Sequence, residues 1–220
     1  MHICRTAPHT IHSDIEGKGK FFTVNLHQVL TDQIKHTLEN GMHVGTTIHL
    51  SLACDGVKLF KSANASFWPF LGMLCDNDPF VIGLFLGTGK PGKNYFKFVV
   101  REIKKAIKHP IEVFGLRYKV VIHNICCDAP ARAHLMNTIT HAGANSCSRC
   151  TSVSKSVNSR MLFDGTYGMP RNSHTFNSLG YSISTNRFTP YQKGPSEFSG
   201  LVDCVEQFNL DIMHLIFEGN

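Results

Sequence analysis

Residues 44–86 contain three consecutive strand-like patterns, and this run constrains the fold more than any other feature of the sequence. In residues 44–54 apolar side chains alternate with smaller or polar ones, which is typical of a strand with one buried face. Residues 66–74 form the second pattern, and residues 80–86 form a third that is apolar throughout, which favours burial on both faces. Because the links between them are short, we expect an antiparallel meander.

A helix, a fourth strand and a second helix are expected after the meander. Residues 94–108 place apolar side chains at helical spacing, with lysines and arginine on the other side, and Pro110 predicts the end of this helix. Residues 118–125 form the fourth strand pattern, and Pro130 is suited to the first turn of the next helix. This order is typical of the first half of a ribonuclease-H-like fold, an α/β mixed sheet with flanking helices.

The remaining segments carry weaker signals. A short strand is expected over residues 21–24 and a short helix over residues 29–38. The sequence predicts four parts: an N-terminal extension (1–42), the first part of a ribonuclease-H-like catalytic core (43–140), a Cys/His-containing insertion rich in Ser, Asn, Gly and Thr (141–200), and a return to the core (201–220).

The composition is that of a folded protein. Hydrophobic residues make up 42% and charged residues 17% of the chain. No apolar run approaches the roughly 20 residues that a membrane helix needs, and the N-terminus has no signal-peptide core, so we expect no membrane partner. The eight cysteines are scattered, which favours reduced thiols over a disulfide scaffold. The net charge of +6 is compatible with a polyanionic partner.

Two aspartates follow strands that are neighbours in a ribonuclease-H-like sheet. Asp55 follows the first, central strand and Asp128 follows the fourth, which lies beside it. Neighbouring strands lie about 4.8 Å apart, so these carboxylates could converge on shared divalent cations, as phosphodiester chemistry requires. Each also has a purely structural interpretation, Asp55 in an Asp-Gly turn and Asp128 as a helix N-cap.

Several segments resemble a CACTA (EnSpm)-type transposase domain, in the same order, over about residues 43–217. These segments are Asp55–Ser62, Ser66–Pro69, Gly87–Pro91, Cys127–Arg132, His141, Cys147–Cys150 and Asp211–Leu215. The resemblance implies DNA cleavage and strand transfer with Mg²⁺ or Mn²⁺, by in-line attack first of water and then of a 3′-hydroxyl. It makes Asp55 and Asp128 the first two acids of a DDE/D triad.

The third acid of such transposases lies on a helix well beyond the motif that ends at His214. The sequence given ends at Asn220, and Glu218 is too close to His214 to match that acid. The expectation is therefore an incomplete catalytic core. The alternative is an inactive or domesticated remnant that binds DNA or protein and contains a structural zinc ion.

The resemblance implies that the partner is DNA, both as transposon ends and as target. A nuclear location follows from that substrate. Whether the chain forms a homo-oligomer is left open. Arg132, beside Asp128, is a candidate for a contact with the scissile phosphate, or else for an ion pair with a carboxylate. Lys90 and Lys93 begin a basic run that continues to residue 108. This run is either a DNA-backbone contact or a solvated helix face.

Cys147 and Cys150 have the Cys-x-x-Cys spacing of one half of a tetrahedral zinc site. The resemblance supplies His141 and His214 as further ligands, with His174 a weaker candidate. Zinc would help to order a segment that is too polar to form its own core. The alternative is a pair of reduced cysteines in a loop; a redox motif is disfavoured because no thioredoxin-like strand precedes it.

Overall fold

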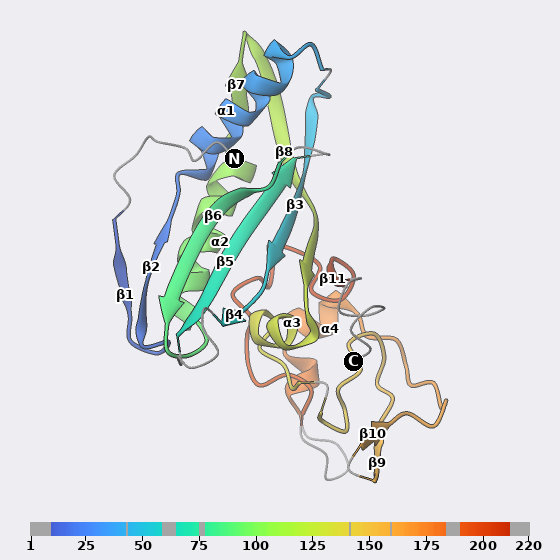
Figure 1. Cartoon of the computed structure of the whole chain (residues 1–220). Coiled ribbons are helices and arrows are strands. Elements are labelled where there is room, and N and C mark those ends of the chain that lie inside the picture. Colours follow the sequence, from blue (N-terminus) through green and yellow to red (C-terminus); the bar gives the residue numbers. More distant parts are fainter. Residues whose placement is uncertain are drawn as a thin grey trace. The chain divides into compact units, whose positions relative to one another are not determined.

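The computed structural model describes residues 10–42, 44–58, 65–74, 78–140, 142–158, 160–183 and 190–211. The chain divides into two compact units, residues 1–125 and residues 126–220, coloured blue to green and yellow to red in Figure 1. No helix in the described ranges is both long enough and apolar enough to cross a membrane.

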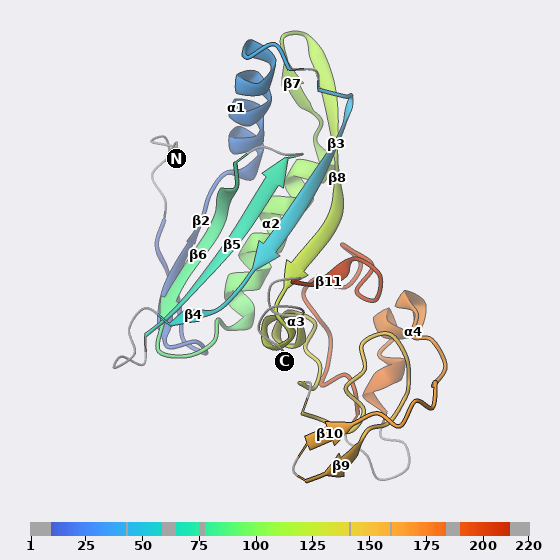
Figure 2. The same ribbon diagram turned by 45° about the vertical axis from the view of Figure 1, so that its right-hand side comes forward.

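The first unit is a curled mixed sheet with two helices on one face (Figures 1 and 2). Its strands are β1 (His12–Asp14), β2 (Gly19–Thr23), β3 (Thr47–Cys54), β4 (Val57–Lys58), β5 (Ser66–Leu74), β6 (Phe80–Gly87), β7 (Ile111–Val113) and β8 (Leu116–Cys127), the last of which runs two residues into the second unit. The helices are α1 (Leu26–Glu39) and α2 (Lys93–Lys108). The strand order is β1-β2-β6-β5-β3-β8, with β4 paired to β5 and β7 to β8.

The predicted meander is confirmed. Strand β3 pairs antiparallel with β5, where Leu52 lies opposite Gly72, and β5 pairs antiparallel with β6, where Trp68 lies opposite Phe85. Strand β3 is also a neighbour of β8, and the arrows of these two strands point the same way in Figures 1 and 2. An α/β mixed sheet is therefore present, with β3 inside it between β5 and β8.

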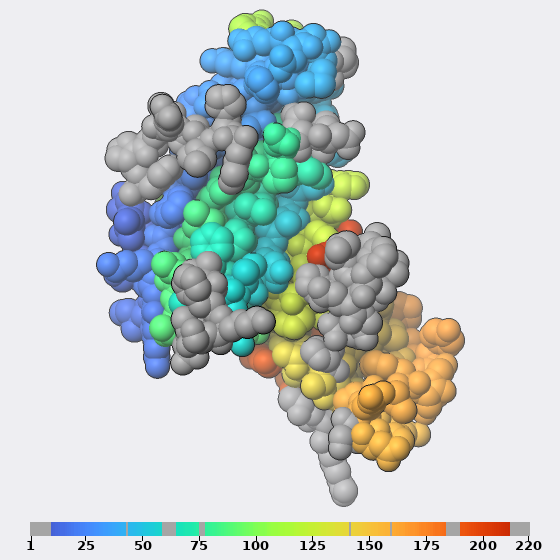
Figure 3. Space-filling view, in the orientation of Figure 1, coloured from blue at the N-terminus to red at the C-terminus, as the bar shows by residue number. Residues whose placement is uncertain are grey.

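Helix α2 packs against one face of this sheet through aromatic side chains. The Tyr95 ring lies 5.5 Å from the Phe21 ring and 6.0 Å from the Phe85 ring, measured between centroids. Its hydroxyl donates a hydrogen bond to the Trp68 carbonyl oxygen at 3.0 Å. Along β5, half-buried side chains such as Leu71 alternate with buried ones and point to the opposite face of the sheet. Atoms of β2, β3, β5 and β6 form the surface on that face (Figure 3).

The segment that we expected to be an N-terminal extension belongs to this sheet. Strand β2 pairs antiparallel with β6, with Phe21 opposite Phe85, and β1 pairs with β2 at the edge. The turn between β1 and β2 also caps α2, because the Asp14 carboxylate accepts a hydrogen bond from the Gly92 amide at 2.6 Å and Glu16 accepts one from the Lys93 amide at 2.9 Å. Residues 10–42 thus contribute to the core of the first unit.

The second unit has little regular structure in its described residues. It contains the end of β8, then α3 (Ala129–Leu135), β9 (Lys155–Val157), β10 (Arg160–Leu162), α4 (Ser173–Asn177), the 3-10 turn η1 (Gly180–Ser182) and β11 (Phe208–Leu210). Its core is aromatic, with Phe176, Tyr191, Phe198 and Phe208 buried. Strand β11 lies beside β8, and the Asp211 amide donates to the Cys127 carbonyl oxygen at 3.0 Å.

Candidate functional site

Asp55 is the first residue after β3 and is half-buried. Its Oδ1 accepts a hydrogen bond from the Gly56 amide at 2.6 Å. A Cβ at Gly56 would lie 2.5 Å from the Trp68 ring, so glycine is needed here for that ring to pack. The Asp-Gly pair therefore has a structural role, which uses one oxygen of the carboxylate.

Asp128 is the first residue after β8 and the N-cap of α3. Its Oδ1 accepts a hydrogen bond from the Ala131 amide at 2.6 Å, and Pro130 lies in the first helical turn as predicted. The N-cap interpretation of Asp128 is confirmed. It does not compete with metal binding, because a carboxylate has a second oxygen and several lone pairs.

The two aspartates occupy equivalent places on neighbouring strands. Each directly follows a buried cysteine, Cys54 or Cys127, that ends its strand. Asp55 belongs to the first unit and Asp128 to the second, so their joint binding of a cation stays a prediction. Among the described residues, no group of three or more His, Cys, Asp or Glu side chains is arranged to hold a metal ion.

Arg132 lies one helical turn after Asp128, and its amide donates to the Asp128 carbonyl oxygen at 2.9 Å. Its side chain helps to line a pocket of about 20 Å³, which has room for about one water molecule. The other lining residues are Ala129, Ala133, Thr138, Ile139, Ser146 and Tyr191. Burial lowers the pKa of the Arg132 guanidinium, and nearby Tyr191 opposes this shift.

No ion pair joins Arg132 to a carboxylate within the described ranges. The alternative interpretation, in which Arg132 forms an ion pair with a carboxylate of this chain, therefore has no support in the described ranges. A half-buried guanidinium beside a small polar pocket is suited to an anionic oxygen supplied from outside the chain.

Lys90 and Lys93 are both exposed. The Lys90 Nζ lies 5.9 Å from the centre of the Trp68 ring, a cation–π contact at its outer limit. Lys93 is the first residue of α2, and its side chain points outward while its amide is capped by Glu16. Their role in DNA binding stays a prediction.

The two cysteines of the Cys-x-x-Cys motif lie side by side, with 3.4 Å between the Sγ atoms of Cys147 and Cys150. Two thiolates on one tetrahedral zinc ion at the usual Zn–S length of about 2.3 Å would lie about 3.8 Å apart. The Sγ of Cys150 is also 3.1 Å from the Ser152 hydroxyl, and this contact lowers the pKa of the Cys150 thiol to about 7. The two sulfur atoms therefore lie somewhat closer together than on a zinc ion, and the lowered pKa favours the thiolate form of Cys150, the form that binds zinc.

The other proposed zinc ligands are not tested by the structure. His141 and His214 lie outside the described residues, and His174 is exposed on α4. None of the six cysteines in the described ranges forms a disulfide, and three of them, Cys54, Cys127 and Cys204, are buried. The zinc ligand set stays a prediction.

An arginine that no sequence pattern indicated holds this loop in place. Arg171 is buried, and its guanidinium carbon lies 4.6 Å from the centre of the Tyr181 ring and 3.9 Å from that of Tyr191. Its Nε donates to the Cys147 carbonyl oxygen and one Nη to the Asn145 Oδ1, both at 3.0 Å. Nothing in the local sequence distinguishes Arg171 from an exposed arginine, because its aromatic partners are ten and twenty residues away.

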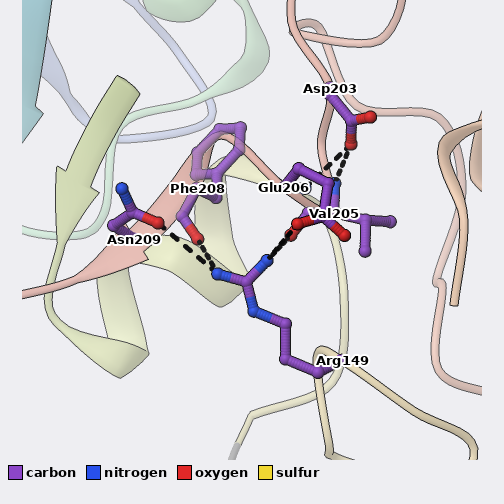
Figure 4. Close-up of polar contacts among 6 residues, drawn as sticks. All are labelled: Arg149, Asp203, Val205, Glu206, Phe208 and Asn209. Carbon is purple, nitrogen blue, oxygen red and sulfur yellow. Dashed lines mark hydrogen bonds and ion pairs between the residues drawn. The ribbon is translucent and has the colours of Figure 1, made fainter. Parts of the chain in front are cut away.

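A second arginine lies between the two cysteines and ties their loop to residues 203–209 (Figure 4). Arg149 donates to the carbonyl oxygens of Val205 and Phe208, and one of its nitrogens lies 3.6 Å from the Glu206 carboxylate. Asp203 shapes that segment, since its Oδ1 accepts hydrogen bonds from two successive backbone amides. The cysteine loop is thus supported by arginine–backbone bonds as well as by any bound metal.

No family model matches the chain, and a search of curated proteins found no match.

Proposed function

We propose that the chain carries part of a DDE/D-type DNA cleavage and strand-transfer domain with a ribonuclease-H-like core. The observation that carries the proposal is that Asp55 and Asp128 directly follow two neighbouring strands, β3 and β8, whose arrows run in the same direction. Parallel neighbours end at the same edge of a sheet, and acids at such an edge are suited to share divalent cations.

In this proposal Asp55 and Asp128 hold Mg²⁺ or Mn²⁺ through the carboxylate oxygens that their turn and cap hydrogen bonds leave available. When bound, these ions activate the attacking water or 3′-hydroxyl and stabilise the leaving oxygen of an in-line displacement. Arg132 lies one turn along α3 with no carboxylate partner among the described residues, so we assign it a contact with a phosphate oxygen. The domain would act in the nucleus, where its DNA substrate is.

The test is Mn²⁺ binding, measured by isothermal titration calorimetry on the full chain and on Asp55→Asn and Asp128→Asn variants. Asparagine keeps the acceptor of each local hydrogen bond, so the turn and the N-cap survive while the metal-binding charge is removed. We expect each substitution to weaken Mn²⁺ binding at least about tenfold, because a ligand and its charge are lost. Asp32→Asn, on the exposed face of α1, is the matched control.

Unchanged Mn²⁺ affinity in both active-site variants would remove the basis of the proposal. So would metal-dependent nicking of duplex DNA that survives either substitution. Loss of binding in Asp32→Asn as well would show a general charge effect rather than a site.

A second candidate function is a binding remnant with a structural zinc ion, and the Cys147–Cys150 pair favours it. The close approach of the two sulfur atoms and the lowered pKa of Cys150 favour a zinc ion whether or not catalysis occurs. Mass-spectrometric metal analysis should find about one zinc per chain in the wild type and in Cys126→Ser, and none in Cys147→Ser/Cys150→Ser. Zinc without Mn²⁺ binding would favour this remnant, and absence of zinc from the wild type would exclude it.

A further inference from the structure

The charge of this chain is concentrated in one segment. Residues 90–108 hold seven of the 22 lysines and arginines and one of the 16 acidic residues, so this segment carries a formal charge of +6, as much as the whole chain. The other 201 residues are balanced in formal charge. An excess confined to 19 residues indicates a specific polyanion-binding surface more strongly than the same excess spread over the molecule would.

The structure places this excess on the outer face of α2. Seven residues of the helix are exposed, and six of them are basic: Lys93, Lys97, Arg101, Lys104, Lys105 and Lys108. With 3.6 residues per turn, all of these except Lys105 fall within an arc of about 80°, and the row is about 22 Å long at 1.5 Å per residue. The exposed face is therefore an almost unbroken row of cations, which we call the basic face of α2.

The single acid of the helix does not neutralise this row. Glu102 is 7% exposed, and its carboxylate lies 2.8 Å from the Lys105 Nζ and 3.4 Å from the Arg101 Nε. The guanidinium of Arg101 is further held over the Phe98 ring at 4.2 Å. In the part of the chain that the structure describes, no carboxylate pairs with the side chains of the other four, Lys93, Lys97, Lys104 and Lys108.

Two other kinds of anion site are disfavoured at this helix. At its N-terminus the amides of Gly92 and Lys93 already donate to the carboxylates of Asp14 and Glu16, and these negative charges disfavour a further anion at the helix end. Its apolar side is buried against the sheet, for example through Tyr95 and Val99, so it has no apolar face to insert into a lipid surface. What remains is the row of exposed cations along the helix.

We infer that the basic face of α2 binds the phosphate backbone of duplex DNA. A duplex carries one negative charge per 1.7 Å of its axis, so a row about 22 Å long can lie along several successive phosphates. This inference shares with the proposed function only the choice of DNA, and it holds whether or not Asp55 and Asp128 bind metal. The contact reads no bases, because lysines on a helix face neutralise phosphates without sequence selection.

The test measures binding of the full chain to a fluorescein-labelled DNA duplex of about 30 base pairs by fluorescence anisotropy, at several KCl concentrations and without divalent cations. Each phosphate contact contributes about 0.9 to the slope of log K against log salt. The variant Lys97→Gln/Lys104→Gln/Lys108→Gln should therefore lower that slope by about 2.7. The control Lys35→Gln/Lys58→Gln/Lys119→Gln, with the same charge change at exposed sites on other elements, should leave it within about one contact of wild type.

Circular dichroism and the fluorescence of Trp68 check that both variants fold, which we expect because glutamine is a good helix former and the lysines are exposed. An unchanged slope in the α2 variant, or an equal loss in the control, would overturn the inference. So would stronger binding to phosphatidylserine vesicles than to the duplex. Because no divalent cation is present, a failed Mn²⁺ test of Asp55 and Asp128 leaves this result unaffected.

Discussion

The Asp14 side chain is predicted to stabilise the first unit through a hydrogen bond from the amide of Gly92, which lies 78 residues further along the chain. This side chain is 1% exposed; Oδ2 accepts a hydrogen bond from the Gly92 amide at 2.6 Å, and Oδ1 accepts a longer one from the Gly17 amide at 3.3 Å. These bonds join the edge of the sheet to the N-terminus of α2. That helix has no side-chain cap of its own, because its N-cap residue is Gly92.

The variant Asp14→Ala should lower the free energy of unfolding by about 2–4 kcal/mol. A hydrogen bond to a charged group contributes about 1.5–3 kcal/mol, and we count one strong and one weak bond. Asp14→Asn keeps one acceptor but turns an amide N–H toward the other donor, so we expect about half of that loss. Asp32→Ala, an exposed substitution on α1, should change the free energy by less than about 0.5 kcal/mol.

Urea unfolding followed by tryptophan fluorescence measures this effect in the first unit alone. Trp68 is the only tryptophan of the chain and lies on β5, 5% exposed. With a slope of about 2 kcal/mol per molar urea, a loss of about 3 kcal/mol moves the midpoint by about 1.5 M. A midpoint for Asp14→Ala within about 0.3 M of the wild type would refute the argument that the β1–β2 turn stabilises α2.

Three further predictions follow from individual contacts. Gly92→Ala places a Cβ 2.5 Å from the Asp14 Oδ1 and should lower the free energy of unfolding by about 1–3 kcal/mol in the same urea assay. In Gly89→Ala the new Cβ meets nothing closer than 3.7 Å, so this control should be nearly neutral. Equal urea midpoints for the two variants would contradict this prediction. In zinc-free protein, the rate at which iodoacetamide modifies Cys150 should rise with pH and reach half its maximum near pH 7, because the pKa of this thiol is lowered. Ser152→Ala should move this half-maximum to higher pH, and mass spectrometry of samples modified at several pH values measures the shift. Burial raises the pKa of Cys204 to about 12, so the contribution of this thiol to stability is fully present below about pH 9 and is lost as the pH rises from 9 toward 12. The difference in unfolding free energy between wild type and Cys204→Ala, followed by circular dichroism, should therefore change above pH 9. A difference that stays constant would contradict the raised pKa.

Local patterns predicted most of the elements that surround the two aspartates. Strand β5 has the predicted bounds, and the helix predicted over residues 94–108 begins one residue earlier as α2. These elements are encoded by the period of their apolar side chains, which a linear sequence displays directly. The same holds for Asp128, because an aspartate followed by Ala-Pro is a local N-cap signal.

The supports of the candidate sites were much less predictable. Arg171 packs against the rings of Tyr181 and Tyr191 and donates a hydrogen bond to the backbone of Cys147, and these residues are ten or more positions away in the sequence. The same applies to Asp14, whose role depends on Gly92. No periodicity records such contacts, since they arise only after separate segments have packed.

By itself, the sequence determined where the strands and helices of the central run lie and that an aspartate directly follows β3 and β8. It also determined that the basic residues between 90 and 108 outnumber the acids by six. Only the tertiary structure decided that β2 joins the sheet beside β6, that Glu102 turns inward so that the face of α2 stays basic, and that Arg171 supports the cysteine loop. The physical reason is that side-chain period depends on near neighbours, whereas strand pairing and burial depend on which distant segments meet.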